Sequence, residues 1–249
     1  MIFKPYRLLI LAVALFCISC QSRYSLVKSN RAECHLDSTI IADTDVINTY
    51  LPYKQKLDAQ MNQVIGTCAK PLTKGNNTET LLGNFFADAI STQVEKIAPE
   101  VDFSIPTTKG GLRLDLPEGP ITLRTIYEMM PFENELVLLK LKGADVEELL
   151  NFIAASGGQP VNGITLKIKD SKAVDVMIKG KPFDSNNTYH VLVSDYLANG
   201  GDNIKGLANP LQRNNVGLLV RNALISHVKQ LTAAGQLINA NLDGRITKI

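Results

Sequence analysis

Two residues with ligand-binding side chains, Tyr196 and Asp202, stand six positions apart on either side of a glycine-rich turn. Asparagine and glycine tolerate the left-handed backbone conformations that a sharp reversal requires. The turn therefore predicts an aromatic ring and a carboxylate on the two arms of one loop, which would suit a flat, hydroxylated ligand such as a nucleoside. The alternative is a purely structural turn after an apolar strand over 190–193. The turn residues are Asn199, Gly200 and Gly201.

A second glycine-rich loop precedes an arginine. It contains Gly110, Gly111 and Arg113 and follows a predicted strand over 101–105. The glycines would let the backbone approach a ligand, and the guanidinium offers a fixed fork of donors for a phosphate or a carboxylate. The alternative is an exposed arginine after an ordinary turn.

A third loop, residues 131–134, carries Phe132 between a predicted helix and a predicted strand. A lone phenylalanine is most often a core residue, but in a turn it can also form an exposed platform on which a ring stacks. The residues alone leave both interpretations open.

The sequence holds no complete hydrolytic site. Its three histidines, His35, His190 and His227, stand in none of the His-x-His, Asp-x-His or Gly-Asn-His arrangements that build a two-metal centre. Neither a Gly-x-Ser-x-Gly elbow nor a phosphate loop ending in Gly-Lys-Ser/Thr occurs. We therefore predict no catalytic residue, no metal ligand and no cofactor in this chain.

The composition is that of an ordinary globular protein, 45% hydrophobic and 20% charged. A formal net charge of +2 gives no basic surface of the kind that a nucleic acid polymer needs, so a polymer ligand is disfavoured. Cys34 and Cys68 could form a disulfide in an exported protein or remain two buried thiols, and their spacing does not distinguish the two.

Residues 1–20 have the pattern of a bacterial export signal. Two basic residues precede an apolar run over 8–16, which is well short of the roughly 20 residues that a bilayer span needs. The segment resembles a lipoprotein signal in which Cys20 receives the lipid, although Cys17 stands where leucine is usual. We expect an exported cell-envelope protein that touches the membrane only through this anchor. Plain secretion, with Cys20 as a small residue near a cleavage site, is the alternative.

Helices and strands are interleaved without a regular βαβ repeat, which predicts an α+β fold. Residues 21–46 are expected to form a tether or edge segment, and 47–249 a single layered domain with a mixed β-sheet and flanking helices. Thr80 and Thr122 are suitable helix caps. Helices are predicted over 47–65, 80–97, 121–130, 144–155 and 216–231, and strands over 68–72, 101–105, 135–142, 164–168, 173–178 and 189–193, with apolar residues continuing through Ala198 and a short strand at Ile246.

Five segments together resemble the C-terminal domain of the 5′-nucleotidase family. The resemblance lies in their order and separation and runs from about Ile47 to the end of the chain, so it is far more specific than any one segment. The segments are Thr80–Ile90, Gly110–Arg113, Ile121–Asn134, Tyr196–Asn203 and Asp243–Ile246.

The resemblance implies a role for each candidate residue. In that family an N-terminal metallophosphatase domain holds two metals and hydrolyses the phosphate ester, while the C-terminal domain grips the nucleoside. Phe132 and Tyr196 would sandwich the base, and Asn134 would bond its edge. Asp202 would accept two ribose hydroxyls, and Arg113 would face the phosphate.

Several positions depart from the family pattern. Tyr196 replaces a phenylalanine, Thr108 replaces an asparagine, and Glu133 replaces a small residue and is expected to bring negative charge beside the base. A second phosphate-binding arginine has no counterpart over 70–79, where the only cations are Lys70 and Lys74.

The sequence also contains no segment that resembles the metallophosphatase domain. We therefore expect a split 5′-nucleotidase in which this chain binds the nucleoside or nucleoside monophosphate and a separately encoded metallophosphatase supplies the divalent metals. The alternatives are a lipid-tethered nucleoside-binding protein without a hydrolytic role and a domain that has kept only the fold.

Overall fold

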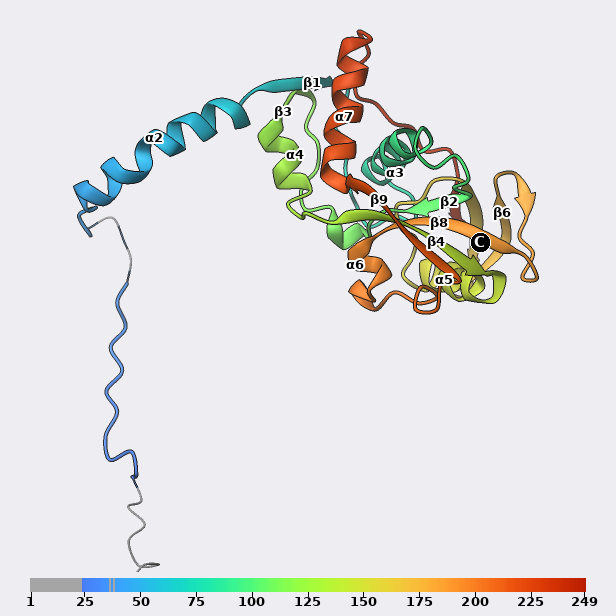
Figure 1. Cartoon of the computed structure of the whole chain (residues 1–249), viewed down its shortest axis with the longest axis horizontal. Helices are drawn as coiled ribbons and strands as arrows, with labels where there is room; N and C mark the ends of the chain where they lie inside the picture. Colours follow the sequence, from blue (N-terminus) through green and yellow to red (C-terminus); the bar gives the residue numbers. More distant parts are fainter. Residues whose placement is uncertain (1–23, 36, 38) are drawn as a thin grey trace, which may run out of the picture. The chain divides into compact units, whose positions relative to one another are not determined.

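The computed structural model of the protein describes residues 24–35, 37 and 39–249 (Figure 1). The chain divides into two units, of which one ends at Thr49 and the other spans Tyr50–Ile249. The predicted signal over residues 1–20 and the lipid site at Cys20 lie outside the described residues. None of the helices that the structure describes is long and apolar enough to cross a membrane.

Helix α2, Thr44–Met61, begins where the carboxylate of Asp43 accepts hydrogen bonds from the backbone N–H groups of Asp45 (2.8 Å) and Val46 (3.2 Å). The helix buries no side chain. Its predicted continuation to residue 65 and the predicted strand over 68–72 are wrong. Residues Val64–Cys68 instead form strand β1, because they pair antiparallel with strand β3, Gly119–Thr122.

The main sheet has the strand order β2-β8-β4-β9. Its strands are β2, Phe103–Ile105, β8, Thr188–Ser194, β4, Glu135–Lys142, and β9, Gln212–Leu219. Strand β8 is parallel to β2 and antiparallel to β4, and β9 is antiparallel to β4. The apolar run of β4 is buried on both faces, because the sheet separates two hydrophobic cores. The central strands therefore lack the polar alternation of a half-exposed sheet.

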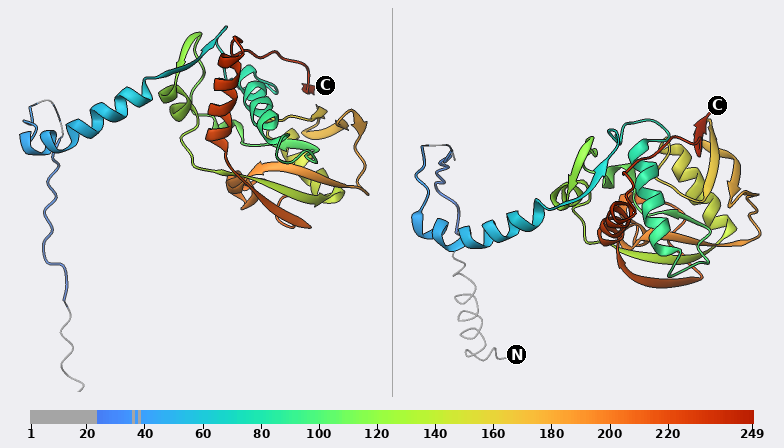
Figure 2. Two further views of the ribbon diagram at one scale, coloured as in Figure 1. Left: turned by 45° about the horizontal axis from the view of Figure 1, so that its top comes forward. Right: turned by 90° about the horizontal axis from the view of Figure 1, so that it is seen from above.

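Helices α3, Leu81–Val94, and α7, Val220–Ala233, cover one face of this sheet (Figures 1 and 2). Both predicted threonine caps are confirmed: the hydroxyl of Thr80 accepts from the N–H of Gly83 at 3.1 Å, and Thr122 forms a capping box with Thr125 at the start of α4, Leu123–Met129. The first core contains large side chains such as Phe86, Leu82, Ile90, Met129 and Leu224.

The predicted start of the last helix at residue 216 is wrong, because residues 212–219 extend the main sheet as β9. Val216 and Leu218 pack against the first core from this strand. Their spacing of two residues places both side chains on one face of a strand, and pairing with β4 forms that strand.

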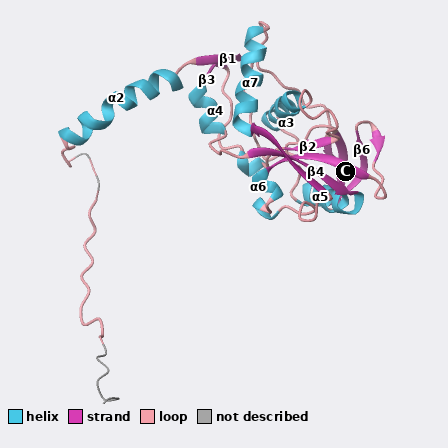
Figure 3. Cartoon of the chain, in the orientation of Figure 1, coloured by secondary structure: helices cyan, strands magenta, loops and turns pink. Residues whose placement is uncertain are grey.

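The other face of the main sheet carries α5, Gly143–Ala155, and a second four-stranded sheet of order β10-β5-β6-β7 (Figure 3). Its strands are β5, Ile164–Lys169, β6, Lys172–Ile178, β7, Lys181–Pro182, and β10, Ile246–Lys248. The predicted α+β class is thus confirmed, with mixed sheets flanked by helices.

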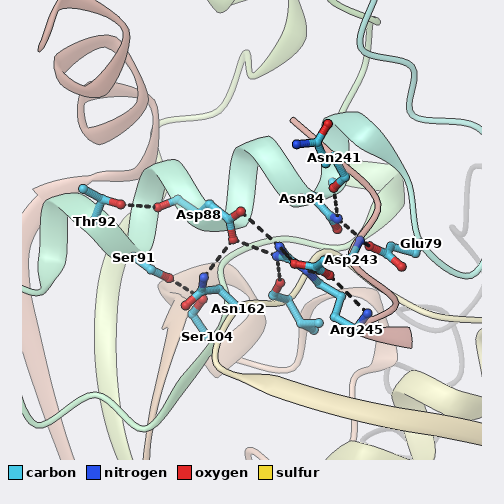
Figure 4. Close-up of polar contacts among 12 residues, drawn as sticks. Glu79, Asn84, Asp88, Ser91, Thr92, Ser104, Asn162, Asn241, Asp243 and Arg245 are labelled. Carbon is cyan, nitrogen blue, oxygen red and sulfur yellow. Dashed lines mark hydrogen bonds and ion pairs between the residues drawn. The ribbon is translucent and has the colours of Figure 1, made fainter. Parts of the chain in front are cut away.

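A polar network ties the end of the chain to α3 (Figure 4). The guanidinium of Arg245 lies 2.7 Å from a carboxylate oxygen of Asp88 and 2.7 Å from one of Asp243, and it donates to the carbonyl oxygen of Val161 at 2.8 Å. Asn162 donates to the same Asp88 carboxylate at 2.8 Å. The network fixes β10 beside β5 and the loop that precedes β5.

Of the cysteines that the structure describes, Cys34 is exposed, Cys68 is buried, and both are free thiols. The Cys68 thiol donates to the carbonyl oxygen of Lys70 at 3.0 Å, and burial raises its pKa.

Candidate functional site

Three loops meet at one edge of the main sheet because of its strand directions. β2 and β8 are parallel, with Ile105 opposite Val193, and β4 runs the other way, with Leu136 opposite Ser194. The residues that follow β2, those that follow β8 and those that precede β4 therefore share this edge. It corresponds to the position outside the carboxyl ends of parallel strands where ligands often bind.

A cavity of about 250 Å³ lies between these loops. Seven of its eight lining residues were selected from the sequence, and the eighth, Thr107, was not. Asn199, Gly200 and Gly201 do not line it. The lining residues are Thr107, Gly110, Gly111, Arg113, Phe132, Asn134, Tyr196 and Asp202.

The first loop forms a 3-10 turn, η1, over Lys109–Gly111. Gly111 is needed for its packing, because a Cβ at this position would collide with the buried Thr107 hydroxyl. The Lys109 ammonium donates to the carbonyl oxygens of Asn77 (2.6 Å) and Gly157 (2.8 Å), and burial lowers its pKa. These bonds fasten the glycine loop to its surroundings.

Arg113 lies with its guanidinium carbon 5.0 Å from the centroid of the Phe132 ring, a cation–π distance. Its backbone N–H donates to the carbonyl oxygen of Met129 at 2.9 Å. The ammonium of Lys74 lies beside the same backbone, 3.1 Å from the carbonyl oxygen of Leu112 and 3.4 Å from that of Arg113. The Lys74 ammonium is therefore a second cation near Arg113, but it donates to backbone carbonyl oxygens of the loop.

The second loop is held by a residue that the sequence did not single out. Arg221, at the start of α7, donates to the carbonyl oxygen of Phe132 at 3.1 Å and to the Glu133 carboxylate at 2.8 Å. Val220 donates its backbone N–H to the carbonyl oxygen of Asn134 at 2.9 Å. Phe132 is partly buried against the first core and also lines the cavity, so it combines both roles that its sequence context allowed.

The expectation that Glu133 adds negative charge beside the base is corrected by this pairing. Glu133 does not line the cavity, and the guanidinium of Arg221 balances its charge. Arg221 is buried and stacks at 4.1 Å from the centroid of the Tyr127 ring. No local signal in the sequence marks Arg221, because its partners lie 88 and 89 residues away.

The third loop begins with a helical turn, α6, Asp195–Ala198, and not with the continued strand that the apolar residues predicted. The Ser194 hydroxyl caps this turn by accepting from the N–H of Leu197 at 3.5 Å. Tyr196 therefore projects from a helix. Asn199 follows this turn, and its side-chain oxygen accepts from the Arg213 guanidinium at 2.8 Å.

A second short 3-10 turn, η2, Gly201–Asn203, positions Asp202. The Tyr196 ring lies against Gly201, where any Cβ would collide with it. The Tyr196 hydroxyl donates to one carboxylate oxygen of Asp202 at 2.8 Å, and the hydroxyl of Thr108 donates to the other. The sequence did not predict the contact of Thr108 with Asp202, which spans 94 residues.

Comparison with known families gives a match to the family described as 5′-nucleotidase, C-terminal domain, over residues 64–209. The chain belongs to this family. The match contains every residue that lines the cavity.

Relatives and solved structures agree with this assignment. The chain is 29% identical to protein UshA of Yersinia enterocolitica over 66% of its own length and 30% of the relative's. It is 25% identical to the cell wall protein Lmo0130 of Listeria monocytogenes over 83% of its own length and 30% of the relative's. The crystal structure of a 5′-nucleotidase precursor from Thermus thermophilus matches with a TM-score of 0.69 and 27% identity, over 81% of this chain and 42% of that one.

The chain thus spans about a third of the length of the curated relatives that it matches. It contains the C-terminal domain of the family, and the cavity lies at one edge of the main sheet of that domain. Among the residues that the structure describes, no group of three or more His, Cys, Asp and Glu side chains could hold a metal ion.

Proposed function

We propose that this chain binds nucleosides and nucleoside monophosphates and forms the substrate-recognition part of a split 5′-nucleotidase. The observation that carries the proposal is one cavity in which a ring, an amide, a carboxylate and a guanidinium meet from three separate loops. Membership of the 5′-nucleotidase C-terminal domain family supports a role in nucleotide recognition. A separately encoded metallophosphatase would complete the enzyme.

Phe132 and Tyr196 would hold the base between their rings. Stacking of this kind contributes about 1–3 kcal/mol per base and tolerates different bases, because every base has a π-face. The side-chain amide of Asn134, on the same wall as Phe132, would bond the polar edge of the base.

Asp202 would accept hydrogen bonds from the ribose hydroxyls, and Arg113 would hold the phosphate. Both interactions are charge-assisted and therefore stronger than bonds between neutral groups. The backbone at Gly110 and Gly111 lines the cavity without side chains, so it leaves room for the ligand to approach Arg113.

Hydrolysis would take place on divalent metals bound by the partner metallophosphatase. The contribution of this chain would be orientation, because a phosphate ester held in one position reacts as if at a high effective concentration. Its cavity residues would hold the nucleoside in one orientation, with the phosphate directed away from the stacked base.

We also propose that the protein is exported to the cell envelope and anchored by a lipid on Cys20. The basic and apolar pattern of residues 1–20 supports export. One relative is named as a cell wall protein, which agrees with this location.

Calorimetry with adenosine and AMP tests the recognition role. We expect Asp202→Asn, which keeps the shape of the side chain, and Phe132→Ala to weaken binding by about tenfold or more, since each removes a charge-assisted bond or a stacking surface. Tyr53→Ala, which removes an exposed ring outside the cavity, is the control and should bind like the wild type. A wild-type chain that binds neither ligand would contradict the recognition role.

The split-enzyme part is tested by adding a metallophosphatase chain and a divalent metal. AMP hydrolysis should rise above that of the metallophosphatase alone and should fall again with Asp202→Asn. Binding of AMP without any such rise would leave a nucleoside-binding protein and contradict the split enzyme.

A further inference from the structure

The Asp202 carboxylate is hydrogen bonded on both oxygens by hydroxyl groups of the chain itself. Tyr196 donates to Oδ1 at 2.8 Å, and the Thr108 hydroxyl donates to Oδ2. Two hydroxyls on the two oxygens of one carboxylate form the same donor pattern that a vicinal diol presents. The side chains of Tyr196 and Thr108 thus each occupy one acceptor site on a carboxylate oxygen to which a ribose diol would also donate.

The two hydroxyls differ in how firmly they are held. Thr108 is 5% exposed and is fixed beside the 3-10 turn of the glycine loop. Tyr196 is 48% exposed, and its ring lies on Gly201 without a place in either hydrophobic core. Rotation of the tyrosine would break two exposed hydrogen bonds to Asp202, whereas movement of the threonine would disturb a packed loop.

The tyrosine hydroxyl also closes the loop in which it lies. It accepts from the backbone N–H of Asp202 at 3.2 Å while donating to that residue's carboxylate. Asp202 itself has a positive φ of 54°, and its carboxylate accepts from the hydroxyl of this ring. The hydroxyl thus joins the loop's two arms.

We infer that the Tyr196 hydroxyl is a specificity-determining group that competes with the ligand's diol for Asp202, while Thr108 is a positioning residue that orients the carboxylate. The inference rests on the proposed function, in which Asp202 accepts ribose hydroxyls. A ribonucleoside binds by displacing the phenol from Oδ1 with one ribose hydroxyl, while Oδ2 keeps the Thr108 bond and accepts the other ribose hydroxyl on its second lone pair. A ligand without a diol makes no bond that replaces the displaced one.

The two roles predict opposite effects of removing one hydroxyl. Tyr196→Phe keeps the stacking ring and removes the competitor, so adenosine should bind about tenfold more tightly, the equivalent of one hydrogen bond to a charged group. Thr108→Val keeps the shape of the side chain and removes the orienting donor, so adenosine should bind more weakly. Thr108→Ser should restore the wild-type affinity.

Calorimetry with adenosine and with 2′,3′-dideoxyadenosine measures these effects. The gain from Tyr196→Phe should appear with adenosine and be absent with the dideoxy compound, which has no hydroxyl for Asp202. Tyr53→Phe removes an exposed hydroxyl outside the cavity and should change neither affinity.

Unchanged or weaker adenosine binding by Tyr196→Phe would overturn the inference, and wild-type binding would still support the proposed function. Equal gains with both ligands would also overturn it, because the hydroxyl would then act on the base and not on the diol. Failure of both the wild type and Tyr196→Phe to bind adenosine would overturn the proposed function and this inference with it.

Discussion

The guanidinium of Arg221 lies 2.8 Å from the carboxylate of Glu133 and joins the first residues of α7 to the turn that carries Phe132 and Asn134. The arginine side chain is 4% exposed, whereas that of the glutamate is 77% exposed. The buried guanidinium of Arg221 therefore pairs with a solvent-exposed carboxylate. One wall of the cavity depends on a helix that contributes no residue to its lining.

Replacement of Arg221 should disturb this wall. Arg221→Met removes the donor to the Phe132 carbonyl oxygen and the stacking on Tyr127, so we expect a loss of about 1–3 kcal/mol in the free energy of unfolding and weaker adenosine binding. Glu133→Gln should cost less than about 1 kcal/mol, because the glutamate remains solvated. Urea unfolding and calorimetry measure the two effects. Arg213→Met, at an exposed arginine that bonds Asn199, is the control. If Arg221→Met changed the free energy of unfolding no more than Arg213→Met does, Arg221 would not support this wall.

The two glycines of the first loop should respond differently to alanine. A Cβ on Gly111 would collide with the buried Thr107 hydroxyl, whereas one on Gly110 would lie 3.6 Å from the Thr108 hydroxyl oxygen, an ordinary contact. Gly111→Ala should therefore destabilise the fold by about 1–3 kcal/mol, and Gly110→Ala by much less. Thermal unfolding of the two variants side by side provides the measurement. Equal melting temperatures would show that Thr107 adjusts freely.

The pairing of Asp243 with Arg245 should make stability depend on acid pH. Hydrogen bonds from the Arg245 guanidinium hold the pKa of the Asp243 carboxyl below its usual range. A carboxyl whose pKa is depressed in the folded state stabilises the fold above its unfolded pKa of about 3.9, and this contribution is lost as the pH falls through the folded value.

Asp243→Asn should remove that contribution. The variant should be less stable than the wild type near neutral pH, and the difference should shrink as the pH falls below about 4. Unfolding followed between pH 2 and 7 measures it, with pH values chosen at about one-unit steps around the ordinary carboxyl pKa. Asp175→Asn, at an exposed carboxylate paired with Lys167, is the matched control. A stability difference that grows toward acid pH would contradict the assignment.

Lipid attachment at Cys20 is testable in cells. Cys20→Ser should move the protein from the membrane fraction to the soluble part of the envelope and abolish labelling by a radioactive fatty acid. Cys17→Ser should leave both unchanged. Labelling that persists in Cys20→Ser would exclude this cysteine as the attachment site.

Much of the fold follows from local sequence. Thr80 and Thr122 cap helices because their hydroxyls satisfy N–H groups only three residues away. The apolar run of β4 and the glycine-rich turns are likewise local signals. The three loops that line the cavity were identifiable because aromatic, charged and glycine residues stand out between apolar elements.

Pairing over long distances decided the remaining elements. The sequence predicted residues 64–65 and 216–219 as parts of helices, but they belong to strands β1 and β9, because a partner strand was available to satisfy the backbone hydrogen bonds. The apolar residues after Val193 likewise form a helical turn and not a continued strand, and the Ser194 hydroxyl caps that turn.

In the candidate site, too, some features follow from local sequence and others depend on long-range contacts. The residue types at Phe132, Asn134, Tyr196, Asp202 and Arg113 could be selected from the sequence, because loop composition and family resemblance are both carried by short segments. Only the tertiary structure brought Thr108 to Asp202 and Arg221 to Glu133, across 94 and 88 residues. A hydrogen bond requires approach within about 3 Å, and the chain achieves that approach only when the antiparallel and parallel strands of the main sheet align their ends at one edge.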